Sequence, residues 1–241
     1  MDRLIIINFR KHEMAVLFKV VLVTLSLTYM LSHITEPVYG KNLNDGVASI
    51  SCMGPVGGKP VIYLHGMDVP SLSKTEQQTR KVLQHLAANQ RLRIALPRSA
   101  RSCRRLPQKR CWNFGRSMAA KVYQDVVASA RNCFLEKDFL LLGHSEGGYY
   151  VSKLVQFCIP HQARAIIAIG SAGSFHVSDP QQLKNCGKLY LLIGDREITR
   201  PKTDRYYHHL KKLGASVSLQ EFSGGHIVPQ LPLEKLIQTL K

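Results

Sequence analysis

The sequence predicts an α/β fold with one mostly parallel central sheet, helices on both of its faces, and no cap domain. Short apolar segments alternate with segments of helical periodicity over most of the 241 residues. These apolar segments have hardly any polar positions, which is typical of parallel strands that are buried on both faces. A Gly-x-Ser-x-Gly segment, residues 143–147, lies where one such strand would meet a helix. Parallel sheets bind ligands at the carboxyl ends of their strands, so we expect a functional site there.

Six strands and five helices are expected in order along the chain. Residues 42–59 are interpreted as an extended, loop-like lead-in, and the basic, cysteine-bearing segment 98–115 as a loop. The expected strands are 59–64, 91–96 (ended by Pro97), 138–142, 163–169, 188–193 and 216–222. The expected helices are 73–89, 116–135, 146–158, 201–213 and 231–240. Ser73 and Glu76 form a capping box that fixes the start of the first helix.

The N-terminus has the layout of a secretory signal peptide, residues 1–40. Basic residues precede an apolar segment, 15–31, and small residues follow at Val38 and Gly40. Met14 is an alternative start that would give a more ordinary leader. The remaining residues, 41–241, are expected to form a single domain, because about 200 residues suit one buried core.

An uncleaved membrane anchor is the alternative interpretation of this leader. After Lys19 only the stretch 20–31 is free of charge, which is shorter than the ~20 apolar residues of a membrane-spanning helix. We therefore expect an exported protein, periplasmic or secreted, with anchoring to the membrane as the alternative.

Cysteine content agrees with export. All six cysteines lie beyond the leader: Cys52, Cys103, Cys111, Cys133, Cys158 and Cys186. An even number in an exported chain favours disulfides, and the absence of a Cys-x-x-Cys pair argues against a zinc site. No metal or other cofactor is expected. Six cysteines allow 15 pairings, of which only Cys103–Cys111, a short loop closure, is suggested by the sequence.

The net charge is +17, from 33 Lys and Arg against 16 Asp and Glu. Such a surface attracts anionic lipid, anionic polymers or acidic substrates, or it serves only as a solvated face. Helix-turn-helix, zinc-finger and RNA-binding aromatic patterns are all missing from the sequence, so no specific nucleic-acid binding is expected.

Ser145 is the predicted nucleophile. Gly-x-Ser-x-Gly between a strand and a helix is the pattern of a nucleophile elbow, where a tight turn projects the serine hydroxyl from the sheet edge. A serine needs a base, and His226, after the last strand, is the candidate. Asp195, directly after the strand 188–193, is the expected acid that orients this histidine.

Other residues compete for these roles. Glu197 is the alternative acid and Asp179 a more remote one. His144, inside the elbow, is expected to be structural. His208 and His209 lie in a basic helix and are weak candidates for the base.

From Pro60 to its C-terminus the chain resembles the α/β-hydrolase superfamily. The resemblance rests on the elbow around Ser145, on Asp195 and His226 in the order that this fold uses, and on His65-Gly66-Met67 after the first strand. It implies an oxyanion hole formed by the backbone N–H groups of Met67 and Glu146. By the same resemblance, His65 is expected to shape the loop and not to take part in the chemistry.

Two segments bear on the substrate. Only residues 170–187 separate the fourth expected strand from the fifth, which leaves no room for a cap and predicts an open site. The segment 98–116 carries seven basic residues and no acidic one. We expect Arg104, Arg105 and Trp112 to form a substrate rim that binds an anionic substrate or a membrane surface, with a basic solvated loop as the alternative.

Three functions are therefore considered. The first is hydrolysis of a small or polymeric carboxylic ester through an acyl-enzyme. The second is peptidase, amidase or thioesterase activity on the same triad. The third is a non-catalytic surface or binding protein that retains the hydrolase fold, which the presence of all the motifs disfavours.

Overall fold

The computed structural model describes residues 46–67, 73–112, 114–175 and 181–240. The expected signal peptide, 1–40, and Asp179 lie outside these residues. Among the described helices, none combines the length and the apolar character that crossing a membrane requires.

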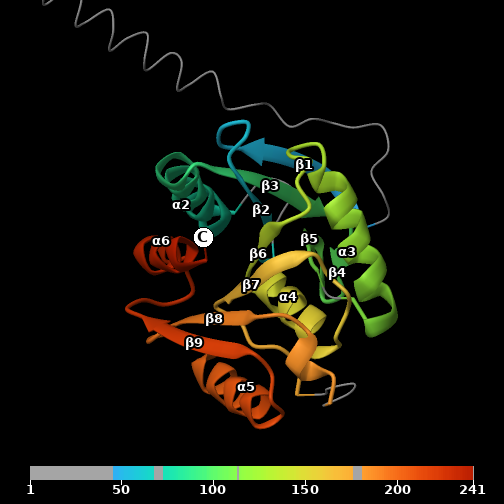
Figure 1. Ribbon diagram of the computed structural model, residues 1–241, viewed down its shortest axis with the longest axis vertical. Helices are drawn as coiled ribbons and strands as arrows, with labels where there is room; N and C mark the ends of the chain where they lie inside the picture. The colour runs from blue at the N-terminus through green and yellow to red at the C-terminus, as the bar shows by residue number, and fades with distance from the viewer. Residues whose placement is uncertain (1–45, 68–72, 113, 176–180, 241) are drawn as a thin grey trace, which may run out of the picture. The chain divides into compact units, whose positions relative to one another are not determined.

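Seven strands form the central sheet (Figure 1). Their order across it is β1-β3-β2-β6-β7-β8-β9, and every neighbouring pair is parallel except β1 with β3. The strands are β1 Val47–Met53, β2 Lys59–Leu64, β3 Leu92–Ser99, β6 Phe139–His144, β7 Ala163–Ile169, β8 Leu189–Gly194 and β9 Val217–Phe222. A separate hairpin, β4 Ser102–Cys103 and β5 Leu106–Arg110, follows β3.

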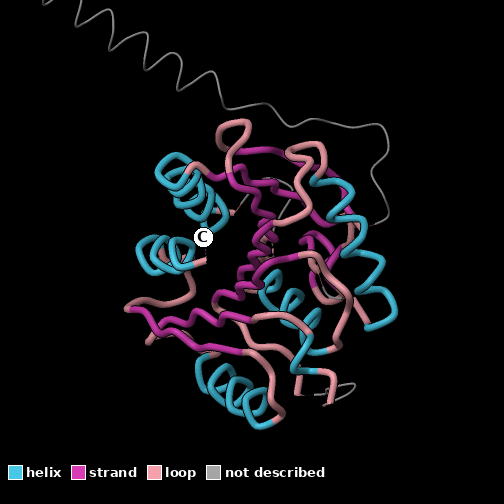
Figure 2. The backbone as a smooth tube through the Cα atoms, viewed as in Figure 1, coloured by secondary structure: helices cyan, strands magenta, loops and turns pink. Residues whose placement is uncertain are grey.

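Helices cover both faces of this sheet, as the sequence predicted (Figure 2). They are α2 Lys74–Gln90, α3 Arg116–Ala130, α4 Glu146–Gln156, α5 Arg200–Lys212 and α6 Gln230–Thr239. Apolar side chains of α3, α4 and α5 form one core with the sheet. Those of α2 and α6 form a second core on the opposite face. The result is the predicted three-layer arrangement, with the sheet buried in the middle.

The expected segments are all present, but four details differ. The segment 98–115, expected as a loop, contains the end of β3 and the β4–β5 hairpin, and α3 ends at Ala130 instead of residue 135. The other two differences concern β1 and β3. The lead-in 42–59 contains β1, which pairs antiparallel with β3 at the sheet edge. A register irregularity between Val47 and Ser49 interrupts the alternation that would have revealed this strand. In addition, β3 runs past Pro97 to Ser99 because it pairs with β1 over this length, while its pairing with β2 ends at Ala95. Beyond that point Pro97 needs no N–H on the β2 side.

Three disulfides stabilise the domain. Cys103–Cys111 closes the β4–β5 hairpin, which confirms the one predicted pairing. Cys52–Cys133 joins β1 to the segment after α3. Cys158–Cys186 joins the segment after α4 to the one before β8. Three disulfides suit an oxidising compartment outside the cytoplasm.

The connection from β7 to β8 adds little to the fold. Its described part, 170–175 and 181–188, contains only a single 3-10 turn, Leu183–Asn185. Within the described residues no cap domain covers the sheet edge.

Candidate active site

Ser145 sits at a strained turn between β6 and α4. Its φ of 54° and ψ of −114° are rare for a residue with a side chain. Its N–H donates to the carbonyl of Ile169 at 2.8 Å, which fastens the turn to the end of β7. A Cβ on Gly143 would overlap the backbone of Gly147, and one on Gly147 would overlap the carbonyl of Leu64. The two glycines thus allow the close approach that holds Ser145 in a strained conformation, a feature typical of functional sites.

His226 lies beside this turn and is paired with a carboxylate. Its Nδ1 is 2.7 Å from Oε2 of Glu197, whose side chain is 1% exposed. Both groups pack against Gly170, because a Cβ there would lie 3.2 Å from Nδ1 and 3.5 Å from Oε2. Gly170 directly follows Ile169, the residue that accepts from Ser145. The histidine–carboxylate pair and the serine therefore meet at the end of β7.

The acid that contacts His226 is thus Glu197, and the prediction of Asp195 in this position is wrong. Asp195 Oδ1 instead accepts from the N–H of Gly224 at 2.9 Å, two residues before His226. Its side chain is 44% exposed and 3.6 Å from Arg196. The bond from Gly224 first, and Arg196 in addition, lowers the pKa of Asp195. Asp195 therefore anchors the loop that carries the histidine.

A turn after β8 explains why the position in the sequence pointed to Asp195, and not to Glu197, as the partner of His226. The N–H of Glu197 donates to the carbonyl of Gly194 at 3.1 Å, so the chain curls back at the strand end. The curl turns the Glu197 side chain toward His226. Glu197 also accepts from the N–H of Thr199, at 3.4 Å, through Oε1. Two polar partners offset the cost of burying this carboxylate.

The expected oxyanion loop is close to the serine. A Cβ on Gly66 would lie 3.1 Å from the Cβ of Ser145, so the segment ending at Met67 borders the hydroxyl. Glu146 is the first residue of α4, where backbone N–H groups lack partners within the helix. His65 is buried and accepts from the N–H of Ser99 through Nε2 at 3.1 Å, with Nδ1 on the carbonyl of Gly66. It therefore shapes this loop, in agreement with the expected structural role.

Two titratable residues flank Ser145, of which His144 is buried and Glu146 is partly buried. His144 is 2% exposed, and burial together with the nearby His226 lowers its pKa to about 3. Its ring lies 4.9 Å from that of His226, centre to centre, so a neutral ring and not a second cation borders the candidate base. Burial also raises the pKa of Glu146, while the charge of Lys153 opposes the rise.

Trp112 does not belong to the predicted substrate rim. Its side chain is 0% exposed and packs against His65 and Tyr150, with ring centres 5.2 Å and 6.0 Å away. Arg104 and Arg105 are exposed at the turn of the β4–β5 hairpin, as a rim requires. Trp112 thus forms the base of this segment, beneath its charged surface.

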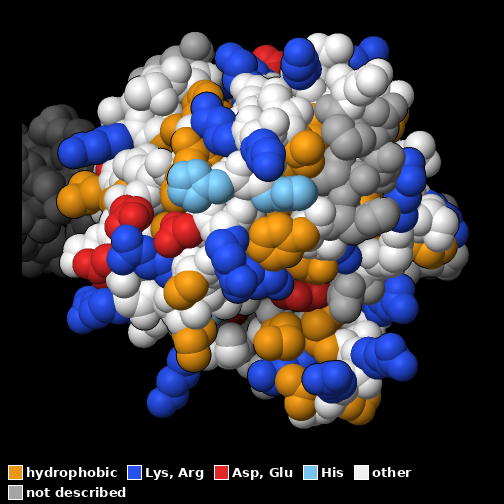
Figure 3. Space-filling model, turned by 90° about the horizontal axis from the view of Figure 1, so that it is seen from below, with side chains coloured by type: hydrophobic (Ala, Val, Ile, Leu, Met, Phe, Trp, Pro, Cys, Tyr) orange, Lys and Arg blue, Asp and Glu red, His pale blue; other side chains and the backbone are white. Residues whose placement is uncertain are grey.

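Basic side chains are widespread on the surface. Figure 3 shows one face of the molecule, on which Lys and Arg side chains surround apolar ones and outnumber acidic ones. His208 and His209 lie in α5, away from the Ser145 turn in sequence and in the contacts they make. In the described part of the chain, no group of three His, Cys, Asp or Glu side chains is arranged to hold a metal ion.

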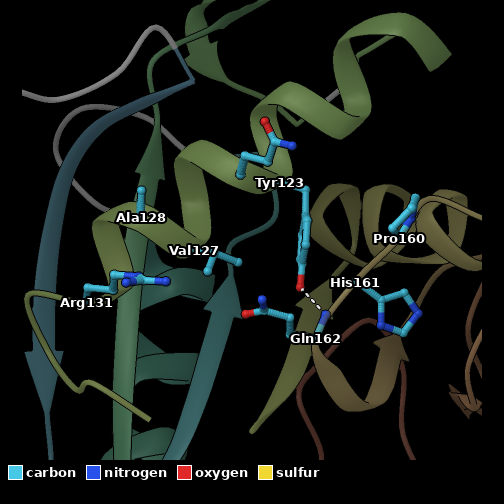
Figure 4. Close-up of a pocket in the computed structure, with 8 residues that line it drawn as sticks. Tyr123, Val127, Ala128, Arg131, Pro160, His161 and Gln162 are labelled. Carbon is cyan, nitrogen blue, oxygen red and sulfur yellow. Dashed lines mark hydrogen bonds between the residues drawn. The ribbon is translucent and has the colours of Figure 1, made fainter. Parts of the chain in front are cut away.

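A separate hollow of about 590 Å³ lies between α3 and the segment that leads into β7 (Figure 4). Ser145, His226 and Glu197 do not line this hollow. Its lining residues are Tyr123, Gln124, Val127, Ala128, Arg131, Pro160, His161 and Gln162. In Figure 4 the Tyr123 hydroxyl reaches across to the backbone N–H of Gln162, at 3.0 Å. This bond ties α3 to the segment before β7.

Comparison with known proteins gives a likeness in structure and none in sequence. No family model and no curated protein matches the chain. A carboxylesterase from Mesorhizobium loti superposes with a TM-score of 0.60 at 16% identity, covering 79% of this chain and 92% of the other. The naproxen esterase of Bacillus subtilis gives a TM-score of 0.59 at 11% identity, over 90% and 96%. YahD with malic acid gives 0.57 at 15% identity, over 80% and 98%. With its mostly parallel sheet, flanking helices and strained serine after β6, the chain has the α/β-hydrolase fold.

Proposed function

We propose that the protein is a serine hydrolase that cleaves a carboxylic ester through an acyl-enzyme. Ser145 is the nucleophile, His226 the base, and Glu197 the acid that orients it. The observation that carries this proposal is the 2.7 Å contact between His226 Nδ1 and buried Glu197, next to a serine at positive φ. A carboxylate on Nδ1 leaves Nε2 as the nitrogen that exchanges protons with the serine.

The reaction follows from these roles. Ser145 Oγ attacks the ester carbonyl as His226 Nε2 takes its proton, and the carbonyl electrons move onto the oxygen. The N–H groups of Met67 and Glu146 bind this oxyanion, and the dipole of α4 stabilises it. The protonated histidine then gives its proton to the leaving alkoxide, and the acyl-serine forms. Water, deprotonated by the same histidine, releases the acid and restores the serine.

An ester is the first choice of substrate because several of the structural neighbours are esterases. Peptide, amide and thioester substrates use the same triad chemistry and form the second choice. In the described connection between β7 and β8 no lid restricts access to Ser145. A large or polymeric ester therefore fits as well as a small one.

The test is hydrolysis of a short-chain chromogenic ester, compared with the matching thioester and anilide. We expect turnover of the ester, and a loss of about 10⁴-fold or more in kcat for both Ser145→Ala and His226→Ala. Faster turnover of the thioester or the anilide would make thioesterase or amidase activity the preferred function. No turnover of any substrate by the folded wild-type protein would favour a binding protein with the hydrolase fold.

Export belongs to the same proposal. The three disulfides support an exported, oxidised protein. We assign residues 1–40 to a cleaved signal peptide and 41–241 to the mature domain, periplasmic or secreted. N-terminal sequencing of the exported protein checks this: a mature chain beginning at Lys41 is expected, whereas retention of the apolar segment would indicate an anchor.

A further inference from the structure

Exposed apolar side chains surround the candidate active site. We call three of them the apolar rim: Met67, Ile198 and Ile227, with exposed fractions of 47%, 92% and 45%. Each lies within five residues of the end of a different strand, namely β2, β8 and β9. Carboxyl ends of parallel strands meet at one edge of a sheet, so the rim lies on the same edge as Ser145. Apolar groups gathered around a site commonly mark a surface that binds a partner.

A basic hairpin flanks the rim on the β3 side. It comprises β4, β5 and their turn, residues 101–110, and contains five basic residues and no acidic one. Arg101 lies over the ring of Phe114, and Arg110 donates to the carbonyl of Ala100. Arg104 and Arg105, at the turn, are exposed and form no ion pair among the described residues. The Cys103–Cys111 disulfide holds the hairpin in shape, so these charges are presented by a fixed element.

Acidic side chains near β8 and β9 do not neutralise the positive charge of the basic hairpin. Asp195 is paired with Arg196. Glu221 and Asp204 are both paired with Arg200, at 2.7 Å and 3.9 Å. Glu197 is buried. The surface around Ser145 therefore combines exposed aliphatic groups with a net positive charge.

We propose that this edge docks onto an anionic lipid surface. Aliphatic side chains gain free energy by entering the interface between headgroups and acyl chains, and each nearby Lys or Arg raises affinity for an anionic leaflet about fivefold. A nucleic acid would leave Ile198 and Ile227 without a favourable partner, because it offers phosphates and base faces and no apolar phase. Docking would present Ser145 to esters within the lipid layer, and this last step rests on the proposed hydrolase function.

Binding to vesicles tests the docking without any catalysis. The inactive full-length domain carrying Ser145→Ala is co-sedimented with phosphatidylcholine vesicles and with vesicles enriched in phosphatidylglycerol. We expect strong preference for the anionic vesicles. Adding Arg104→Glu and Arg105→Glu should weaken that binding by about 25-fold or more. Adding Ile198→Ser instead should also weaken it, with little risk to folding because this side chain is 92% exposed.

The matched control reverses two charges elsewhere. Lys211→Glu and Lys212→Glu lie at the end of α5, next to the start of β9 and so at the opposite edge of the sheet. They change the net charge by the same amount and should leave anionic-vesicle binding within about twofold. Equal weakening by the control and the hairpin variant would overturn the proposal in favour of diffuse attraction. Equal binding to both vesicle types would also overturn it, as would binding that Ile198→Ser leaves unchanged. A protein that docks as expected but hydrolyses no ester would refute the proposed function alone.

Discussion

Asp195 and Glu197 are two carboxylates separated by a single residue, and they act on the same histidine in different ways. Glu197 contacts the ring of His226 directly. Asp195 holds the backbone of Gly224 and so fixes the path of the loop. Sequence reasoning favoured the residue nearest to the strand end. It missed the turn from Gly194 that brings the second carboxylate back over the sheet edge.

Substitution of each acid by its amide separates the two roles. Glu197→Gln keeps the size of the side chain but removes the charge that stabilises protonated His226, so kcat should fall about 10³-fold or more. Asp195→Asn keeps an oxygen for the N–H of Gly224, and kcat should fall less than about tenfold. Ester hydrolysis under saturating substrate is the measurement. The opposite ranking would return the acid role to Asp195.

The low pKa of buried His144 is expected to make the stability of the fold depend on pH. Burial first, and His226 second, lower its pKa to about 3 in the folded protein, against about 6.5 in the unfolded chain. Between these values the unfolded state binds the extra proton, so the free energy of unfolding falls as pH drops below about 6.5. The slope is about 1.4 kcal/mol per pH unit, and the accumulated loss in the free energy of unfolding is about 4 kcal/mol at pH 3.

Denaturant unfolding at a series of pH values checks this dependence. His144→Leu should flatten the decline between pH 6.5 and 4, because the buried proton-binding group is gone. Substitution of His85, which is exposed on α2, serves as the control and should leave the decline intact. An unchanged slope in His144→Leu would mean that other groups cause the acid sensitivity.

At the scale of elements, the strand-to-helix connection at Ser145 depends on glycine. Gly143→Ala would place a Cβ against the backbone of Gly147 and Gly148, which cannot move aside without breaking the turn. We expect a loss of about 4 kcal/mol or more in the free energy of unfolding. Gly115→Ala, before α3, meets no atom within 4 Å and should change stability by less than about 1 kcal/mol. Similar thermal melts for the two variants would contradict this account of the turn.

The buried strands and amphipathic helices were predictable because their periodicity is local information. All six expected strands and five expected helices appear within a few residues of their expected bounds, apart from the end of α3. Elements that depend on distant partners were not predictable. β1 exists because β3 supplies its hydrogen bonds, and Trp112 is buried because His65 and Tyr150 enclose it. Neither dependence leaves a periodic signal in the sequence.

At the scale of the whole molecule, architecture is retained where sequence likeness is weak. Eight of the structural neighbours share between 11% and 18% identity with the chain, yet they superpose over about four-fifths of it or more. A sheet buried on both faces constrains apolar character and volume more than residue identity. The residues that meet at the end of β7 come from loops, which is where proteins that share a fold commonly carry their functional groups.

The central claim is that Ser145 is an activated nucleophile, and covalent labelling tests it most directly. The folded, disulfide-bonded protein is treated with a fluorophosphonate probe, and the modified peptide is identified by mass spectrometry. We predict a single adduct on Ser145, slowed strongly by His226→Ala and by Glu197→Gln, and abolished by Ser145→Ala. A folded wild-type protein that remains unlabelled, or one labelled at a different serine, would contradict the account.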